Sequence, residues 1–195
     1  MLGAAVLAAQ LGDELAFSTL YRAIQPGLLR YLTVLVAAEA EDVAAETWLQ
    51  VSRDLHTFSG DGDGFRGWVI TIGRHRALDL VRARSRRPAT PYPLDYLSAT
   101  AGPDDTAAAA AETISTAAAL DLIRSLPRDQ AEAVLLRAVI GLDAVAAGRV
   151  LGKRPGAVRM SAHRGLRKLA QRLDGAPETA DGVTAGPPDA LTELS

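Results

Sequence analysis

The chain has 195 residues, of which 48% are hydrophobic and only 5% aromatic, and alanine is abundant. This composition favours close-packed helices over sheets, so we expect an all-α protein. The absence of cysteine excludes disulfides, thiolate metal sites and a catalytic thiol, and the three histidines have no metal-binding spacing. We therefore expect neither a metal site nor a cofactor.

The net charge of -2 conceals two strongly basic segments. Residues 66–87 contain seven arginines and one acid, and residues 142–173 contain eight Lys or Arg and one acid. Together the two segments hold 15 of the 21 basic residues, whereas residues 88–121 and 174–195 have five acids each and no base. Such segregation indicates two separate contacts with a polyanion such as nucleic acid.

The N-terminal segment is apolar and alanine-rich. It lacks the positively charged start of a signal peptide, and Asp13 and Glu14 interrupt its apolar run, so we expect an amphipathic helix. No stretch approaches the roughly 18 uninterrupted apolar residues of a membrane span. We therefore expect a cytoplasmic protein without membrane insertion.

Residues 1–87 are expected to form a first helical domain with four helices. Pro26 should separate two of them, because proline lacks an N–H and clashes with the preceding turn. The predicted helices run near Asp13 to Ile24, from Gly27 to Ala37, from Glu39 to Leu55 and from Phe65 to about Arg84.

The helix predicted from Glu39 to Leu55 is amphipathic. Its apolar residues fall within one arc of about 140° at 100° per residue. These residues are Val43, Thr47, Trp48, Val51 and Leu55. The opposite face carries an acidic stripe of Glu39, Asp42 and Glu46, which the residues alone predict to be a solvated surface.

The helix that starts at Phe65 is both basic and amphipathic. Its apolar side carries Phe65, Trp68, Val69, Ile72 and Leu80. Its arginines can pair with phosphates, and Trp68 could stack on a base, but its place on the apolar arc favours a role in the core. We expect the lone acid, Asp79, to form a salt bridge with an arginine.

Prolines, glycine and acids interrupt regular structure after residue 87, and we assign residues 88–116 to a flexible, acidic, Pro/Ala-rich linker. The alanine run within it predicts a helix from about Asp105 to Ser125, ended by Pro127. Residues 174–195 have no hydrophobic period, which predicts a disordered tail.

Residues 117–173 are expected to form a second domain that ends in a helix-turn-helix. After a helix reaching Ile140, a short helix contains the small residues 146–148, which permit close crossing of a second helix. Leu151 and Gly152 begin the turn, and Pro155 lies where the first turn of a helix tolerates proline.

The last predicted helix has one apolar and one basic face. Val158, Ala162, Leu166, Leu169 and Leu173 share a narrow arc and should face the core. The outward face carries Arg159, Met160, His163, Arg164, Arg167, Lys168 and Gln171. A row of long donors on the second helix of such a motif is typical of a protein that reads the major groove of duplex DNA.

Nothing in the sequence favours an enzyme. No carboxylate pair lies in a context that suggests acid–base catalysis, and neither a phosphate-binding glycine loop nor a nucleophile elbow is found. We expect a non-enzymatic, DNA-binding protein.

Taken in order, these segments resemble bacterial RNA polymerase sigma factors of the sigma-70 family, in the extracytoplasmic-function group. The resemblance to region 2 rests on AEDVAAETWLQV and FRGWVITIGRHRALDLVRARSRR. The resemblance to region 4 rests on SLPRDQAEAVLLRAVIGL and the helix-turn-helix after it. The match covers roughly residues 15–173, and four motifs in one order are more specific than any alone.

The resemblance implies a division of labour between the two domains. The first domain would bind the β′ clamp helices of core RNA polymerase through Asp42 and Glu46. It would melt and read the promoter -10 element with residues Ser59, Arg74, His75, Arg76, Arg82 and Arg84. The second would read the -35 element with Arg159, Met160, His163, Arg164, Arg167 and Lys168, while its back contacts the β flap. The linker would thread the RNA channel of the polymerase.

Three positions depart from the family pattern. Ala45 stands where glutamine is usual, His75 where asparagine is common, and Gly148 where a helical alanine is usual, at a cost of up to ~1 kcal/mol. Two other functions stay open, a one-component regulator acting without polymerase and a protein-binding adaptor, and the basic C-terminal segment disfavours the adaptor. The sequence also leaves open whether an anti-sigma protein binds the chain.

Overall fold

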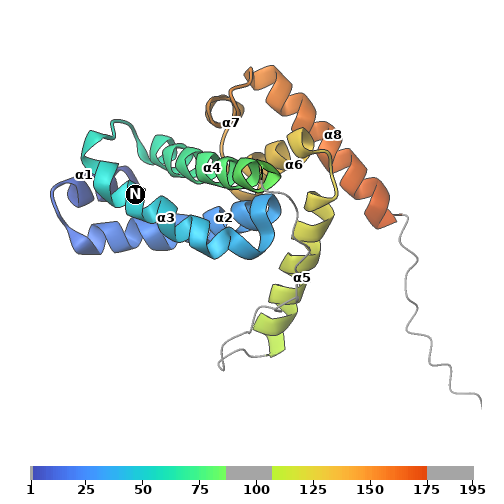
Figure 1. Ribbon diagram of the computed structural model, residues 1–195, viewed down its shortest axis with the longest axis horizontal. Helices are drawn as coiled ribbons and strands as arrows, with labels where there is room; N and C mark the ends of the chain where they lie inside the picture. The colour runs from blue at the N-terminus through green and yellow to red at the C-terminus, as the bar shows by residue number, and fades with distance from the viewer. Residues whose placement is uncertain (1, 87–106, 175–195) are drawn as a thin grey trace, which may run out of the picture.

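The computed structural model describes residues 2–86 and 107–174, and within these ranges every regular element is a helix (Figure 1). The all-α prediction is confirmed for this part of the chain. Residues 88–106 of the predicted 88–116 linker and the predicted tail beyond residue 174 lie outside the described residues, and the rest of the predicted linker belongs to a helix that begins at Ala107.

The first unit contains four helices, α1 (Leu2–Gln10), α2 (Glu14–Val36), α3 (Ala40–Asp54) and α4 (Gly62–Arg86). The helix α2 packs against the other three, and its start is capped by Asp13, whose carboxylate accepts a bond from the Ala16 N–H at 3.0 Å. The five residues predicted on the apolar arc of α3 are all buried, which confirms the orientation of this helix.

The predicted break at Pro26 is wrong, because α2 runs through this residue without interruption. The helix loses one backbone hydrogen bond there, at a cost of about 3 kcal/mol. Burial on both sides of the proline offsets this cost, since Ile24, Leu28 and Tyr31 are all in the core. Tertiary packing therefore overrides the local signal of the proline.

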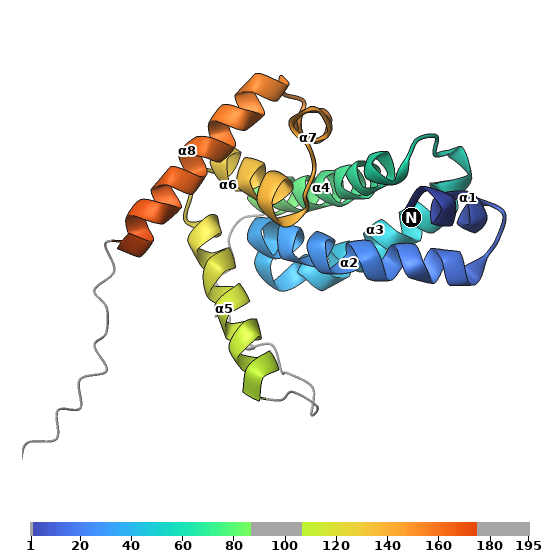
Figure 2. The same cartoon turned by 180° about the vertical axis from the view of Figure 1, so that it is seen from behind.

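The second unit contains α5 (Ala107–Arg124), α6 (Arg128–Val134), α7 (Ala144–Leu151) and α8 (Pro155–Asp174). The helix α6 continues into a wider π turn at Leu135–Val139, where the Ile140 N–H donates to the Leu135 carbonyl at 2.9 Å. Figure 2 shows α5 and α8 at the end of the molecule opposite α1. The helix predicted from about Asp105 to Ser125 is confirmed as α5.

Asp143, for which no role was predicted, caps the start of α7 by accepting a hydrogen bond from the Ala146 N–H at 2.6 Å. The turn between α7 and α8 has the predicted chemistry. Gly152 ends α7 with φ of 65°, a left-handed conformation that glycine adopts without strain. Pro155 is the first residue of α8, so the helix-turn-helix prediction is confirmed in its local geometry.

The inner face of α8 is narrower than predicted. Val158 and Ala162 are buried and Leu169 is partly buried, as expected. Leu166 and Leu173, however, are 48% and 61% exposed, so their prediction as core residues is wrong. The main partner of α8 is α6, which has only seven residues, and α8 extends beyond it (Figure 1).

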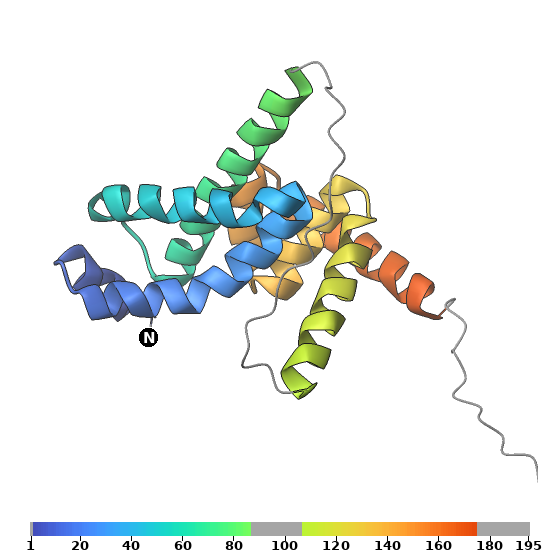
Figure 3. The same ribbon diagram turned by 60° about the horizontal axis from the view of Figure 1, so that its bottom comes forward.

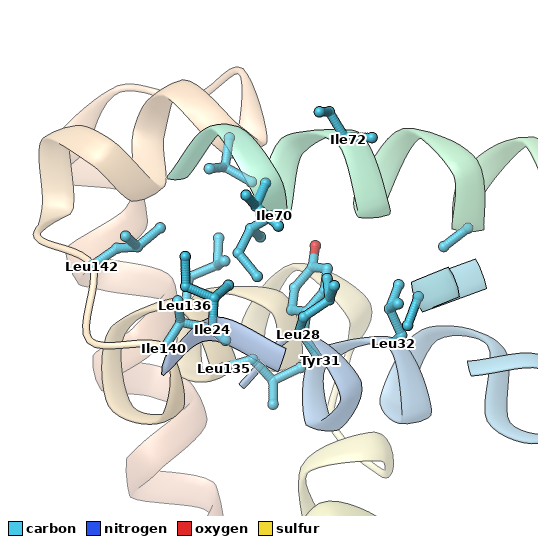
Figure 4. Packing of buried hydrophobic residues seen from close by; sticks show 14 of the residues in the cluster. Ile24, Leu28, Tyr31, Leu32, Ile70, Ile72, Leu135, Leu136, Ile140 and Leu142 are labelled. Carbon is cyan, nitrogen blue, oxygen red and sulfur yellow. The ribbon is translucent and has the colours of Figure 1, made fainter. Parts of the chain in front are cut away.

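The two units pack against each other through α2 and α4 on one side and α5, α7 and the turn at Leu135–Val139 on the other, with Glu132 of α6 bonded to both α2 and α4. Figure 4 shows the apolar contact, with Ile24 and Leu28 of α2 near Leu135, Leu136 and Ile140. The three leucines are fully buried and the two isoleucines nearly so, and one hydrophobic core spans both units. In Figure 3, α5 and the C-terminal end of α4 project on opposite sides of this joined body.

The tight packing of Gly148 against the turn of the helix-turn-helix leads us to predict an effect of substitution on stability. A Cβ atom at Gly148 would lie 2.6 Å from the backbone oxygen of Lys153. The expectation that glycine is here only a cost relative to alanine is therefore wrong. We predict that Gly148→Ala lowers the free energy of unfolding by about 1–3 kcal/mol, because backbone has to move.

Chemical denaturation followed by circular dichroism measures this effect. Gly156→Ala is the matched control, because no atom lies within 4 Å of a Cβ placed at this helical position. The control should be as stable as the parent or more stable by up to about 1 kcal/mol. Equal stability of Gly148→Ala and the parent would show that the turn has no such constraint.

Candidate nucleic-acid interface

The outer face of α8 is a continuous row of exposed polar side chains. The six residues predicted to read DNA there are all exposed, including the one apolar member, Met160. They are Arg159, Met160, His163, Arg164, Arg167 and Lys168. The buried Val158, Ala162 and Gly165 occupy the opposite arc and fix this face outward.

The basic residues of this face have no counter-charge in the part of the chain that the structure describes. Among residues 2–86 and 107–174, no carboxylate lies in an ion pair with Arg159, Arg164, Arg167 or Lys168. Two other long cations of this unit do have partners, since Lys153 pairs with Asp129 at 2.6 Å and Arg172 donates to Ser125. The outer face of α8 is therefore ready to accept an external anion.

Most of the basic residues of α4, in contrast, have carboxylate partners within the chain. Each of the four arginines predicted to contact the -10 element pairs with a carboxylate of this chain. Arg74 pairs with Glu132 at 2.6 Å, Arg76 with Glu46 at 2.7 Å, Arg82 with Asp79 at 2.9 Å, and Arg84 with Glu39. The predicted salt bridge of Asp79 is confirmed. His75 and Ser59 are exposed.

These pairs join residues that the sequence analysis assigned to different surfaces. Glu46, predicted to contact polymerase, accepts a bond from Arg76, which also donates to the Gln50 side chain at 3.1 and 3.2 Å. The pair is partly solvent-exposed, so its net contribution to stability is at most about 1 kcal/mol. An external partner can therefore displace it at low cost.

The outer face of α3 contains a residue that the sequence analysis missed. Asp42 and Glu46 are exposed as predicted, and Leu49 beside them is 58% exposed. At 100° per residue Leu49 falls close to Asp42 on the helical wheel, outside the apolar arc, and this position was the available signal. The face is thus acidic with one apolar side chain, not purely polar.

The loop before α4 is anchored to the rest of the first unit. The side chain of Gln10 in α1 donates to the carbonyl oxygens of Leu55 and Phe58 at 2.9 and 2.7 Å. Trp68 packs on Phe58 and Phe65 with ring centroids 5.2 and 5.6 Å apart, which confirms its predicted place in the core. Sequence reasoning did not find Gln10, because its partners lie 45 or more residues away.

A buried carboxylate lies where the two units meet. Glu132 of α6 is 3% exposed and accepts hydrogen bonds from Arg74 at 2.6 Å, Arg128 at 2.9 Å and the Tyr31 hydroxyl at 3.2 Å. Burial and the neighbouring charge of Glu132 raise the pKa of Tyr31 well above its usual value. Burial alone would lower the pKa of Arg74, but the hydrogen bond and charge of Glu132 raise it.

No group of His, Cys, Asp or Glu side chains in the described residues could hold a metal ion. None of the helices in this part of the chain is long and apolar enough to cross a membrane. The candidate interface consists of two basic surfaces, on α8 and α4, and one acidic surface, on the outer face of α3.

Comparison with known families identifies both units. The family description "Sigma-70 region 2" matches residues 20–87, and "Sigma-70, region 4" matches residues 116–169. The first match contains most of α2 and all of α3 and α4, and the second contains most of α5 to α8.

Two relatives match nearly the whole chain. The ECF RNA polymerase sigma factor ShbA of Streptomyces griseus is 33% identical over 87% of this chain and 93% of its own length. SigD of Mycobacterium tuberculosis, also an ECF RNA polymerase sigma factor, is 32% identical over 92% of this chain and 87% of its own length. A third, BldN of Streptomyces coelicolor, is 35% identical over 85% of this chain, but the chain spans only 63% of BldN.

Solved structures have the same fold. CnrH, solved in complex with the cytosolic domain of CnrY, has a TM-score of 0.62 at 23% identity and matches 88% of this chain and 96% of its own. RpoE of Bartonella quintana, solved with the anti-sigma factor NepR, has a TM-score of 0.60 at 19% identity and matches 82% and 98%. With both regions, their order and these relatives in agreement, the chain belongs to the sigma-70 family, as a transcription initiation factor of the extracytoplasmic-function (ECF) group.

Proposed function

We propose that this protein binds core RNA polymerase and directs initiation at promoters whose -35 and -10 elements it reads with different units. The observation that carries the proposal is the outer face of α8, an exposed basic row on the second helix of a helix-turn-helix, with no carboxylate partner among the described residues. The family membership supplies the context in which such a helix acts. The protein would work in the cytoplasm and without catalysis of its own.

The α8 face would read the -35 element in the major groove. Arginine there can donate two hydrogen bonds to guanine, and the remaining cations can contact phosphates. The Arg164 side chain lies in the middle of the exposed row and is the residue to which we assign base recognition. Arg159, Met160, His163, Arg167 and Lys168 would flank it on the same groove.

The first unit would contact the -10 element along α4 and the loop before it. Six residues are assigned to this surface: Ser59, Arg74, His75, Arg76, Arg82 and Arg84. The side chains of Arg82 and Arg84 are 64% and 53% exposed, and their internal ion pairs can exchange for phosphates. The core polymerase would bind the outer face of α3, with Asp42 and Glu46 facing basic residues and Leu49 facing an apolar pocket.

An anti-sigma protein is a further partner class that we propose. CnrH and RpoE, which share the fold, were each solved with a second protein, and for RpoE that protein is an anti-sigma factor.

Residues 117–173 would serve as the -35 unit, 1–87 as the polymerase and -10 unit, and 88–116 as the connection between them.

Arg164→Ala should weaken recognition of the -35 element by about 1–3 kcal/mol if the side chain makes a bidentate base contact. The measurement is promoter affinity of the reconstituted holoenzyme on native and -35 mutant templates. Arg172→Ala is the matched control, because it removes the same charge from α8 at a residue that faces Ser125 of the adjoining loop.

The control should lose little affinity on either template, and core binding should survive in both variants. If Arg164→Ala and the parent discriminate equally between the native and -35 mutant templates, Arg164 does not read a base.

Asp42→Lys with Glu46→Lys should lower affinity for core polymerase, because both charges on the outer face of α3 are reversed. Fluorescence anisotropy of the labelled protein titrated with core polymerase gives the dissociation constant. Asp42→Lys alone separates docking from folding, since Glu46 has an internal partner, Arg76. Glu41→Lys, on another side of the same helix, is the charge-matched control.

The two variants that carry Asp42→Lys should bind more weakly than the Glu41→Lys control while their unfolding curves stay cooperative. If the double variant binds core polymerase as tightly as the parent, the acidic face of α3 is an ordinary solvated surface and not the docking site.

A further inference from the structure

The loop between α3 and α4, residues 55–61, is tied at its start to α1. Gln10, the last residue of α1, donates through its side-chain Nε2 to the carbonyl oxygens of Leu55 and Phe58 at 2.9 and 2.7 Å. A primary amide has two N–H groups, so one side chain can serve both carbonyls. The Phe58 carbonyl directly precedes Ser59, which the proposed function places at the -10 element. Gln10 therefore fixes the backbone just before this residue.

The same helix also contacts the end of the α3–α4 loop. A Cβ atom at Gly62, the first residue of α4, would lie 2.6 Å from the Cβ of Leu2 at the start of α1. Figures 1 and 2 both show α1 beside this loop. Val6 and Ala9 are buried, so α1 is itself anchored on the core. From Leu2 to Gln10 a helix rises about 12 Å, and a rigid element of this length sets the separation of the two loop ends.

Between its tied ends, the middle of the α3–α4 loop is exposed but has a defined backbone. Ser59, Gly60 and Asp61 are all exposed. A Cβ atom at Gly60 would lie 2.9 Å from the Phe58 ring, so the backbone folds closely over that ring. The Asp61 carboxylate accepts a bond from the Gly64 N–H at 2.7 Å, which fixes the entry into α4. The exposed segment is thus short and held on both sides.

Discrimination between bases requires such a fixed surface. An unpaired base is recognised by hydrogen bonds to its edges and by stacking, and these contacts need positions held within about 0.5 Å. A mobile loop has to be ordered on binding and can adjust to a wrong base. The match to sigma-70 region 2 begins at residue 20, so α1 lies entirely before the residues that this family description covers.

We propose that α1 determines how strictly the first unit discriminates between bases of the -10 element, with Gln10 as a positioning residue that holds the α3–α4 loop in one conformation. Gln10 acts through the backbone carbonyls of Leu55 and Phe58 and is not itself a DNA contact. This inference rests on the proposed function, which places the loop at the -10 element.

Gln10→Glu tests the proposal, because it replaces the donating NH2 group by an oxygen at nearly constant size. Reconstituted holoenzyme transcribes native templates, templates with single-base changes in the -10 element, and templates with changes in the -35 element. We expect the preference for native over -10 variant templates to fall at least about fivefold, since two hydrogen bonds to the loop are lost. The preference for native over -35 variant templates should stay that of the parent.

A role in folding alone gives a different result. It would lower transcription from every template by the same factor and leave both preferences unchanged, and this outcome would overturn the proposal. Leu11→Glu is the matched control, because it adds the same charge at the neighbouring residue, whose side chain is 91% exposed. The control should keep both preferences of the parent.

Two further substitutions at Gln10 separate the donors from charge and size. Gln10→Lys supplies the donors of an ammonium group and should recover most of the -10 preference. Gln10→Met has similar length but neither donor nor charge, so it should lose this preference as Gln10→Glu does. It also replaces Gln10→Glu if circular dichroism shows that the latter does not fold. A Gln10→Met protein with the -10 preference of the parent would refute the proposal.

Hydrogen exchange in the free protein, followed by NMR, separates this inference from the proposed function. The Phe58 N–H donates to the Leu55 carbonyl at 3.1 Å, and the Gly64 N–H donates to Asp61. Both amides should exchange at least about fivefold faster in Gln10→Met than in the parent, with amides of α8 unchanged. Equal exchange would show that Gln10 does not hold the loop. If the parent itself ignores changes in the -10 element, the proposed function fails, and the exchange rates alone decide whether Gln10 positions the loop.

Discussion

The architecture of this protein depends on how a single buried carboxylate, that of Glu132, is satisfied. Removing a carboxylate from water costs several kcal/mol, and only close donors repay that cost. Arg74, Arg128 and Tyr31 provide them from three different helices. Loss of one charged partner in such a cluster typically costs about 3–5 kcal/mol, so the relative placement of the two units is sensitive to this one group.

The two basic segments of the sequence differ in whether their cations have carboxylate partners in the folded chain. On α8 the cations face solvent with no carboxylate partner among the described residues, whereas on α4 each predicted DNA-contacting arginine has one. Three of these α4 ion pairs are exposed or half-buried, so a phosphate can easily replace the carboxylate as the partner of the arginine. The pair of Arg74 is the exception, because its partner is almost completely buried.

Local signals predicted most of the helices and the helix-turn-helix. Gly152 and Pro155 each act within one turn of their own position, so a sequence pattern is sufficient to predict the turn and the start of α8. Trp68 was assigned to the core from its place on a helical face, which also needs only local periodicity.

The errors and omissions share a different cause. Whether α2 continues through Pro26, and whether Leu166 and Leu173 are covered, depends on which helices pack beside them and how long those helices are. The partnership of Arg74 with Glu132 joins residues 58 positions apart across two units, and no period or motif reports such a distance. Composition located the basic segments, but only the tertiary structure distinguished the accessible one from the occupied one.

Run-off transcription with purified core RNA polymerase tests the central claim most directly, that both units of this sigma factor act together on one promoter. The template library should carry paired -35 and -10 elements at varied spacing, with either element scrambled in matched members. The account predicts discrete transcripts that require the added protein and disappear when either element is scrambled. Transcripts that form without the protein, or that survive scrambling of either element, would contradict it.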